Sequence, residues 1–173
     1  MKTKTTIALL LSLVGQLLQV ANGYPDGAPF CGEAVKLTPG HAARGVTPRS
    51  AISPSLPRPT IIPHQQCYVP GQMMPVTITS STPFKGFFMF AYCDYCARKK
   101  GAFTPGGDGV SRVKCTTDQL GITHSSNALK NNVTVYWTAP TDYRQQFRFR
   151  ATVVKSFTEW WQDISGPSVP PCY

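Results

Sequence analysis

Apolar and polar residues alternate with a period of two in several short segments of this chain. Residues 75–79 and 133–137 alternate in this way, and residues 110–115 form a shorter candidate. The clearest alternation spans residues 147–153, and it places on one face Phe147, Phe149, Ala151 and Val153. Such alternation is typical of β-strands with one buried face and one wet face.

The densest apolar run after the N-terminal segment, residues 84–91, contains four phenylalanines and lies between Pro83 and Cys93. It is too short to span a bilayer, so we interpret it as a central strand that other strands must cover. Gly86 predicts a bulge or a close backbone approach within it. No long segment after residue 23 follows a 3.6-residue apolar period. The pattern therefore predicts an all-β fold, a two-sheet antiparallel β-sandwich.

Residues 45–63 are rich in proline, and proline cannot donate to a sheet ladder. We interpret this segment as a surface loop. A long loop of this kind often has a functional role, and a simple spacer is the alternative.

Residues 1–23 have the layout of a secretory signal peptide. Lys2 and Lys4 precede an apolar stretch, which is followed by the small residues Ala21 and Gly23. The apolar core is shorter than the roughly 18 residues that a membrane anchor needs. We therefore predict secretion, with residues 24–173 as a single domain.

The mature chain is strongly basic. Removing Lys2 and Lys4 leaves 15 of the 17 basic residues against 8 acidic ones, a net charge of +7. A basic secreted domain is attracted to anionic surfaces, such as bacterial envelopes, sulfated glycans or phospholipid headgroups. Nucleic acid fits the charge but not the compartment, and we expect only peripheral contact with membranes. Charge does not indicate an oligomeric state.

Six cysteines lie in the mature chain, and in an oxidising compartment an even number implies disulfides. Spacing does not select among the 15 possible pairings. Cys93 and Cys96 form a Cys-x-x-Cys motif, which in a redox site stands at a helix N-terminus and in a zinc site needs two further ligands. Here the motif follows a strand, so we expect structural bridging.

No catalytic motif, cofactor site or metal site emerges, and we predict that the chain is not an enzyme. The three histidines, His41, His64 and His124, are scattered and have no nucleophile motif nearby. His124 precedes Ser125 and a general-base role is conceivable. We interpret it instead as a polar turn residue.

Two basic features are candidate binding sites for anions. Arg98, Lys99 and Lys100 follow the Cys-x-x-Cys motif on an expected loop. Arg148 and Arg150 share one strand face, and we group Tyr136 of the preceding strand with them, since an arginine pair beside an aromatic ring can bind anionic sugars or lipid phosphates. A plain solvated sheet face is the alternative.

Asn132-Val133-Thr134 is an acceptor sequence for N-linked glycosylation. Secretion makes it usable, and its position at the start of a predicted strand makes it reachable. Burial by that strand would prevent glycosylation, so the occupancy of Asn132 stays open.

An ordered series of short motifs runs through nearly the whole mature chain and resembles the reeler domain, the module named for the N-terminal part of reelin. The motifs are Tyr24-Pro25-x-Gly27-Ala28, Cys31, Pro39-Gly40-His41, Tyr68-x-Pro70-Gly71, Phe84-Lys85-Gly86-Phe87, Gly101-x-Phe103, Cys115, Thr123-His124, Lys130, Trp137-x-Ala139-Pro140, Ala151-Thr152-Val153-Val154, Trp160 and Ile164-x-Gly166-Pro167. The resemblance implies an immunoglobulin-like antiparallel β-sandwich. It also implies a disulfide between Cys31 and Cys115.

This sequence departs from the family pattern at Cys93 and Cys96, where relatives usually continue with Ala-Arg. Cys67 and Cys172 complete this extra set. The pairing is either Cys67 with Cys172 and Cys93 with Cys96, or a crossed arrangement between the two pairs.

The reeler family includes matrix proteins, membrane-bound reductases and stand-alone secreted defence proteins of invertebrates that are associated with haemocyte nodulation. The chain ends shortly after the module, so the resemblance is closest to the defence proteins. We therefore expect binding to lipopolysaccharide, lipoteichoic acid or other microbial glycans and anionic lipids. Aggregation, nodulation with haemocytes or antimicrobial activity would follow from that binding. A matrix module that binds sulfated glycans or a protein partner is the alternative, and an electron-transfer accessory is a third class.

Overall fold

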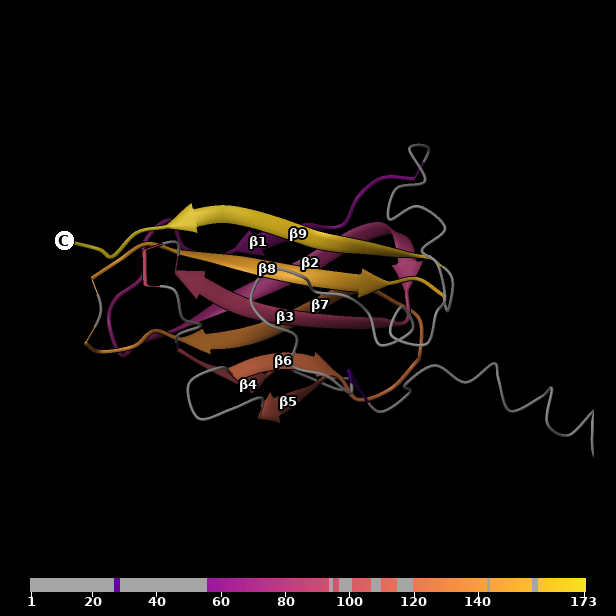
Figure 1. Ribbon diagram of the computed structural model, residues 1–173, viewed down its shortest axis with the longest axis horizontal. Helices are drawn as coiled ribbons and strands as arrows, with labels where there is room; N and C mark the ends of the chain where they lie inside the picture. The colour runs from indigo at the N-terminus through magenta and orange to yellow at the C-terminus, as the bar shows by residue number, and fades with distance from the viewer. Residues whose placement is uncertain are drawn as a thin grey trace, which may run out of the picture.

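The computed structural model describes residues 27–28, 56–93, 95–96, 101–106, 110–114, 120–142, 144–156 and 159–173. These residues form nine β-strands and no helix (Figure 1). The strands are β1 (Thr60–Pro63), β2 (Met73–Phe84), β3 (Gly86–Cys93), β4 (Ala102–Pro105), β5 (Val110–Lys114), β6 (Leu120–His124), β7 (Lys130–Thr138), β8 (Phe147–Val154) and β9 (Trp160–Val169). No helix capable of crossing a membrane occurs in the part of the chain that the structure describes.

The strands build two antiparallel sheets that pack face to face, which confirms the predicted sandwich. One sheet has the order β1-β2-β7-β4, and the other has the order β5-β6-β3-β8-β9. In Figure 1 the five-stranded sheet lies in front of β1, β2 and β7. Between the sheets Trp137 packs edge-on or tilted against Tyr68, Phe147 and Phe149, with ring centroids 5.1–5.7 Å apart. Aromatic packing of this kind supplies much of a core's energy.

The predicted alternating strands are present. β2 and β7 contain residues 75–79 and 133–137 and are paired through Val76 and Val135. In β8 the four residues expected to face inward are fully buried, whereas Arg148 is exposed. Each large apolar side chain buried in this way contributes roughly 1.5–3 kcal/mol.

The phenylalanine-rich run contains the central strand of the five-stranded sheet, but it does not lie within one strand. Phe84 is the last residue of β2, Lys85 is the connecting residue, and β3 begins at Gly86. β3 lies between β6 and β8 and is buried on both faces. Gly86 is needed for a close approach, as predicted, although its neighbour is the His124 ring, 2.8 Å from where a Cβ would stand.

The prediction of a structureless loop over residues 45–63 was wrong at its end. Residues 60–63 form β1, which pairs with β2 and buries Ile61. Because β1 is an edge strand, its proline removes no ladder hydrogen bond, and the sheet accommodates it. Residues 45–55 lie outside the described part of the chain.

Sequence reasoning also missed β4, β6 and β9. β9 has two register irregularities against β8, one between Arg148 and Arg150 and one between Ala151 and Val153. Each irregularity shifts the side-chain alternation by one residue, so no continuous period of two survives over the strand.

Two disulfides resolve the pairing that sequence left open. Cys67 bonds Cys172, with Cα atoms 5.0 Å apart, and Cys93 bonds Cys96, with Cα atoms 5.3 Å apart. The first bridge fastens the C-terminus beside Tyr68, whose carbonyl accepts a hydrogen bond from the Cys172 amide at 2.8 Å. Cys31 and Cys115 lie outside the described residues, and so does the predicted signal peptide.

The two bridges should differ in their contribution to stability. Replacing Cys67 and Cys172 by alanine should lower the free energy of unfolding by about 5 kcal/mol, because that bridge closes a loop over 105 sequence positions. Replacing Cys93 and Cys96 should cost about 2 kcal/mol, because the loop spans only 3 positions. Urea denaturation of both double variants measures the difference. A larger loss for the Cys93–Cys96 variant would contradict this assignment.

Candidate functional site

Arg148 and Arg150 project from β8 onto the outer face of the five-stranded sheet, as predicted. Arg150 Nε donates a hydrogen bond to Asp163 Oδ1 at 2.6 Å, and its Nη2 donates to Asp163 Oδ2. The guanidinium also lies over the Tyr92 ring, 5.4 Å from its centroid. A bidentate pair with a planar carboxylate fixes the orientation of an arginine, so Arg150 is held in place on this face.

Asp163 reaches Arg150 because of a bulge in β9. The register passes from Ala151 opposite Ile164 to Val153 opposite Trp161, so two residues of β9 lie opposite Thr152. Asp163 is one of them, and its φ of 54° places it in the left-handed region, which aspartate tolerates better than most residues. The bulge therefore supplies the carboxylate that pairs with Arg150.

The ion pair between Arg150 and Asp163 reduces the positive charge that the outer face of the five-stranded sheet presents to an anion. The Asp163 side chain is 39% exposed and that of Arg150 is 18% exposed, so the Arg150 charge is already compensated by a neighbour. Arg148 lies opposite Tyr92 in the register and is exposed. The two arginines share one face as predicted, but the aromatic ring beside them is Tyr92, and Arg148 is the more exposed of the two.

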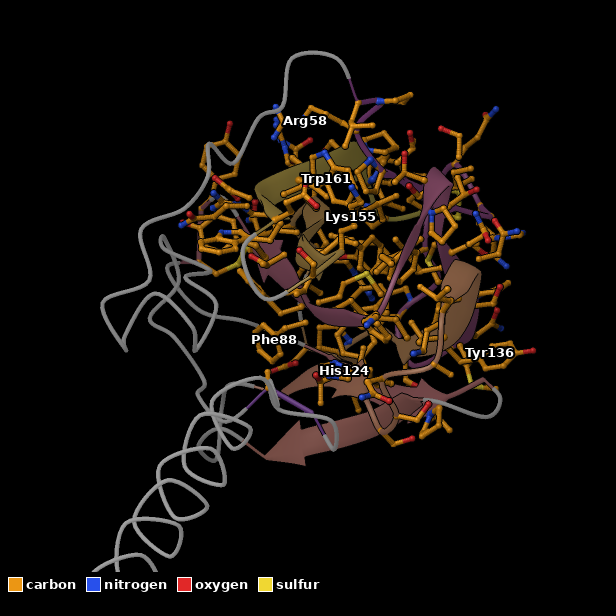
Figure 2. All side chains as sticks on the ribbon, turned by 90° about the vertical axis from the view of Figure 1, so that its right-hand side faces the viewer. Arg58, Phe88, His124, Tyr136, Lys155 and Trp161 are labelled. Atoms are coloured by element: carbon orange, nitrogen blue, oxygen red, sulfur yellow. A yellow bond between two sulfur atoms is a disulfide. The ribbon has the colours of Figure 1, made fainter. Side chains whose placement is uncertain are left out.

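The grouping of Tyr136 with these arginines was wrong. Tyr136 belongs to β7 in the four-stranded sheet, and β8 belongs to the other sheet. The chain crosses between the sheets after Thr138, so outward-facing residues of β7 and β8 point to opposite sides of the sandwich. Figure 2 shows Tyr136 on the side away from Phe88, which lies on the outer face of the five-stranded sheet.

The other predicted basic group, Arg98, Lys99 and Lys100, lies outside the described residues. The described part of the preceding loop holds the Cys93–Cys96 bridge and Tyr95, whose side chain is 75% exposed. No group of three histidine, cysteine, aspartate or glutamate side chains suited to a metal ion occurs within the described ranges.

His124 is not a turn residue but the buried last residue of β6, with 7% of its surface exposed. Its Nδ1 accepts a hydrogen bond from the Phe87 amide at 3.1 Å. Next to it, Thr123 Oγ1 accepts from the Ala28 amide at 3.0 Å and donates to the Phe87 carbonyl at 2.6 Å. Thr123 therefore connects Ala28 to the central strand, and Thr123 and His124 both act as structural residues.

Lys130 has a structural role that sequence reasoning did not assign. Its Nζ donates to three carbonyls, those of Lys85 at 2.9 Å, Ser126 at 2.7 Å and Ala128 at 2.7 Å. Burial lowers the pKa of this ammonium group from its ordinary value, and the three acceptors compensate for lost hydration. Lys130 fastens the turn that follows β6 to the connection between β2 and β3.

The opposite end of the sandwich is organised around Tyr68. Its hydroxyl donates to the Gln145 carbonyl at 2.7 Å, and burial raises the pKa of the phenol. Gly101, with a φ of 81°, lies so close to Trp137 that a Cβ would stand 2.2 Å from Nε1. Only glycine fits there, since it has no Cβ and tolerates positive φ.

Motif residues within the described ranges thus lie at both ends of the sandwich, Gly86, His124 and Lys130 at one end and Tyr68, Gly101 and Trp137 at the other. A family model for the Reeler domain matches residues 34–171. The chain belongs to the Reeler domain family. At one end Lys130 of the motif series holds the turn after β6 against the β2–β3 connection, and at the other end Tyr68 is hydrogen-bonded to Gln145.

The chain is similar to two kinds of reeler protein. "Putative defense protein 3" of Antheraea mylitta is 31% identical over 88% of this chain and 88% of that protein. Human "Ferric-chelate reductase 1" is 33% identical over 87% of this chain. The chain spans only about a quarter of the length of the reductases that it matches, 24% for the human protein.

Solved structures agree on the fold. The reeler domain of human F-spondin superposes with a TM-score of 0.57 at 15% identity, over 68% of this chain and 89% of that one. A second structure, of the Reelin-N domain of F-spondin, gives a TM-score of 0.53 at 14% identity, over 69% of this chain and 90% of that one. At these identities the likeness shows the fold alone.

The Lys130 contacts predict a measurable loss of stability. Lys130→Met should lower the free energy of unfolding by about 1–3 kcal/mol, because three carbonyls lose a charged donor. Lys155→Met is the matched control, since Lys155 pairs with Glu159 at 2.9 Å on the surface, and its loss should stay within about 0.5 kcal/mol. Chemical denaturation checks both values. Equal losses in the two variants would refute the structural role of Lys130.

Proposed function

We propose that this chain is a secreted defence protein that binds anionic microbial surfaces. The observation that carries the proposal is the similarity to the Antheraea mylitta protein named as a defence protein, which extends over 88% of both chains. The reductase similarity covers a much smaller share of the relative, 24%. We therefore propose a binding protein rather than a redox enzyme.

The N-terminal sequence and the charge support this function. Residues 1–23 have the basic, apolar and small-residue order of a secretory signal. The remaining net charge of +7 favours contact with phosphate-rich envelope polymers such as lipopolysaccharide and lipoteichoic acid. Aggregation of microbes, nodulation with haemocytes or direct killing are the outcomes that such binding would serve.

The outer face of the five-stranded sheet is the proposed contact surface. Arg148 is exposed there, and Arg150 is fixed beside it by Asp163 and Tyr92. Asp163 holds Arg150 in place and also reduces its attraction for a second anion. A phosphate can take the place of the carboxylate, because both accept two parallel N–H donors from a guanidinium.

Binding to bacteria should be electrostatic. The purified mature chain, incubated with Gram-negative or Gram-positive cells, should sediment with them at low ionic strength and be released at about 1 M salt, where the screening length falls to about 3 Å. Protein that stays entirely in the supernatant at low ionic strength would contradict the function. Retention on heparin without binding to cells would favour a matrix role instead.

Three variants locate the contact. The double variant Arg148→Gln with Arg150→Gln should bind cells several-fold more weakly, whereas Asp163→Asn should bind more tightly, because it removes the charge that competes for Arg150. Lys155→Gln is the control for net charge, since it lies in the connection between β8 and β9 and pairs with Glu159. The measurement is a binding isotherm on immobilised lipoteichoic acid. If Lys155→Gln, which removes one charge, weakens binding by half as much in free energy as the double variant, which removes two, the outer face of the five-stranded sheet is not the contact surface.

A further inference from the structure

The outer face of the four-stranded sheet differs from that of the five-stranded sheet in its charge, since the described strands place no free charged side chain on it. Among the four described strands of this sheet, Lys130 is the one charged residue, and its ammonium group is occupied by three carbonyls. The outward-facing residues are Thr60, Ile62, Met73, Pro75, Thr77, Thr79, Ala102, Thr104, Asn132, Thr134, Tyr136 and Thr138. The face is therefore rich in threonine and uncharged.

Thr77 lies in the middle of a short hydrogen-bonded row across this face. Thr77 Oγ1 lies 2.8 Å from Thr134 Oγ1 and 2.8 Å from His64 Nε2, so a hydrogen-bonded row connects β7, β2 and the residue after β1. Ile62 and Met73 are exposed at 44% and 53%. The edge strands β1 and β4 have no charged side chain. An uncharged sheet face with exposed apolar side chains is prone to associate with another copy unless something covers it.

Asn132 stands on this same face. It points outward from β7, one of the two inner strands of this sheet, opposite Thr79 of β2, and it is exposed. Of the three sequon residues only Val133 faces the core. The concern that the strand would bury the acceptor asparagine therefore does not apply.

The same strand carries the residues that a glycan on Asn132 would reach. Thr134 and Tyr136 lie two and four positions further along β7 and also face outward. At about 3.4 Å per residue they are about 7 Å and 14 Å from Asn132, within reach of the first sugars. Tyr136 is half-buried, and Figure 2 shows its side chain projecting outward from the sheet. The C–H face of a pyranose ring can pack on such an aromatic surface.

We propose that Asn132 carries an N-linked glycan that lies along β7 over Thr134 and Tyr136 and prevents two copies of the chain from associating through this face. A bulky, hydrophilic glycan supplies the solubility that charged side chains supply on other sheets. The two outer faces then have separate roles, a glycan-covered one on the four-stranded sheet and an arginine-bearing one on the other. This inference does not depend on the proposed microbial ligand.

Modification is tested on the full chain secreted from insect cells. Intact mass should fall by one N-glycan on treatment with an N-glycosidase, because the sequence contains one such sequon. Asn132→Gln should abolish the shift. Thr134→Ser should keep it, and Asn127→Gln, an exposed asparagine outside any sequon, should leave it unchanged. A wild-type mass equal to that of the bare chain would overturn the proposal.

The position of the glycan is tested by oxidative footprinting of tyrosines. Tyr136 should be oxidised several-fold faster in Asn132→Gln than in the glycosylated protein, whereas Tyr95, in the Cys93–Cys96 loop, should be oxidised equally in both. Equal oxidation of Tyr136 in the two proteins would show that the glycan does not lie over it.

The role of the glycan is tested by oligomeric state. Light scattering should give a monomer for the glycosylated chain and larger species for Asn132→Gln, and adding Thr79→Lys to that variant should restore the monomer by placing a charge on the face. Circular dichroism checks that each variant is folded. An Asn132→Gln protein that stays monomeric over the same concentration range would overturn the shielding role.

Discussion

The burial of β3 on both faces is the constraint on which the other features of this sandwich depend. Phe87, Met89 and Ala91 point into the core between the sheets, and Phe88 and Phe90 form a second apolar cluster on the outer face with Ala28 and Tyr92. Strands of antiparallel sheets usually leave one face to water. Here Gly121 leaves room for the Phe88 ring, whose Cζ would be 2.5 Å from a Cβ at that position. Ala28 is held at this cluster by the hydrogen bond of its amide to Thr123.

This constraint explains why the family motifs lie where they do. Gly86 permits His124 to approach β3, and Lys130 fastens the turn beside it. At the other end Tyr68 and Trp137 close the core, and the Cys67–Cys172 bridge holds the C-terminus against Tyr68. The motifs that identify a reeler domain therefore describe how the fold is fastened.

The sequence predicted two kinds of strand, those with a regular period of two and the dense phenylalanine run that contains most of β3. β2, β7 and β8 alternate cleanly, so their inward residues could be named in advance. β9 could not be predicted, because its two bulges interrupt the period of two. The bulge opposite Ala151–Val153 is also the one that brings Asp163 to Arg150. The misplacement of Tyr136 has a topological cause, since two strands adjacent in the chain belong to different sheets. His124 was misassigned because polarity alone does not reveal a buried hydrogen bond to a backbone amide.

The two outer faces differ in chemistry, and a titration followed by nuclear magnetic resonance tests this difference most directly. An isotopically labelled, glycosylated chain would be titrated with a soluble glycerol phosphate oligomer, the repeating unit of lipoteichoic acid, while amide and guanidinium signals are recorded. We expect shifts centred on Tyr92, Arg148, Arg150 and Asp163, which lie together on the five-stranded sheet. Shifts centred instead on Thr77, Thr134 and Tyr136 of the four-stranded sheet, or no shifts on either face, would contradict it.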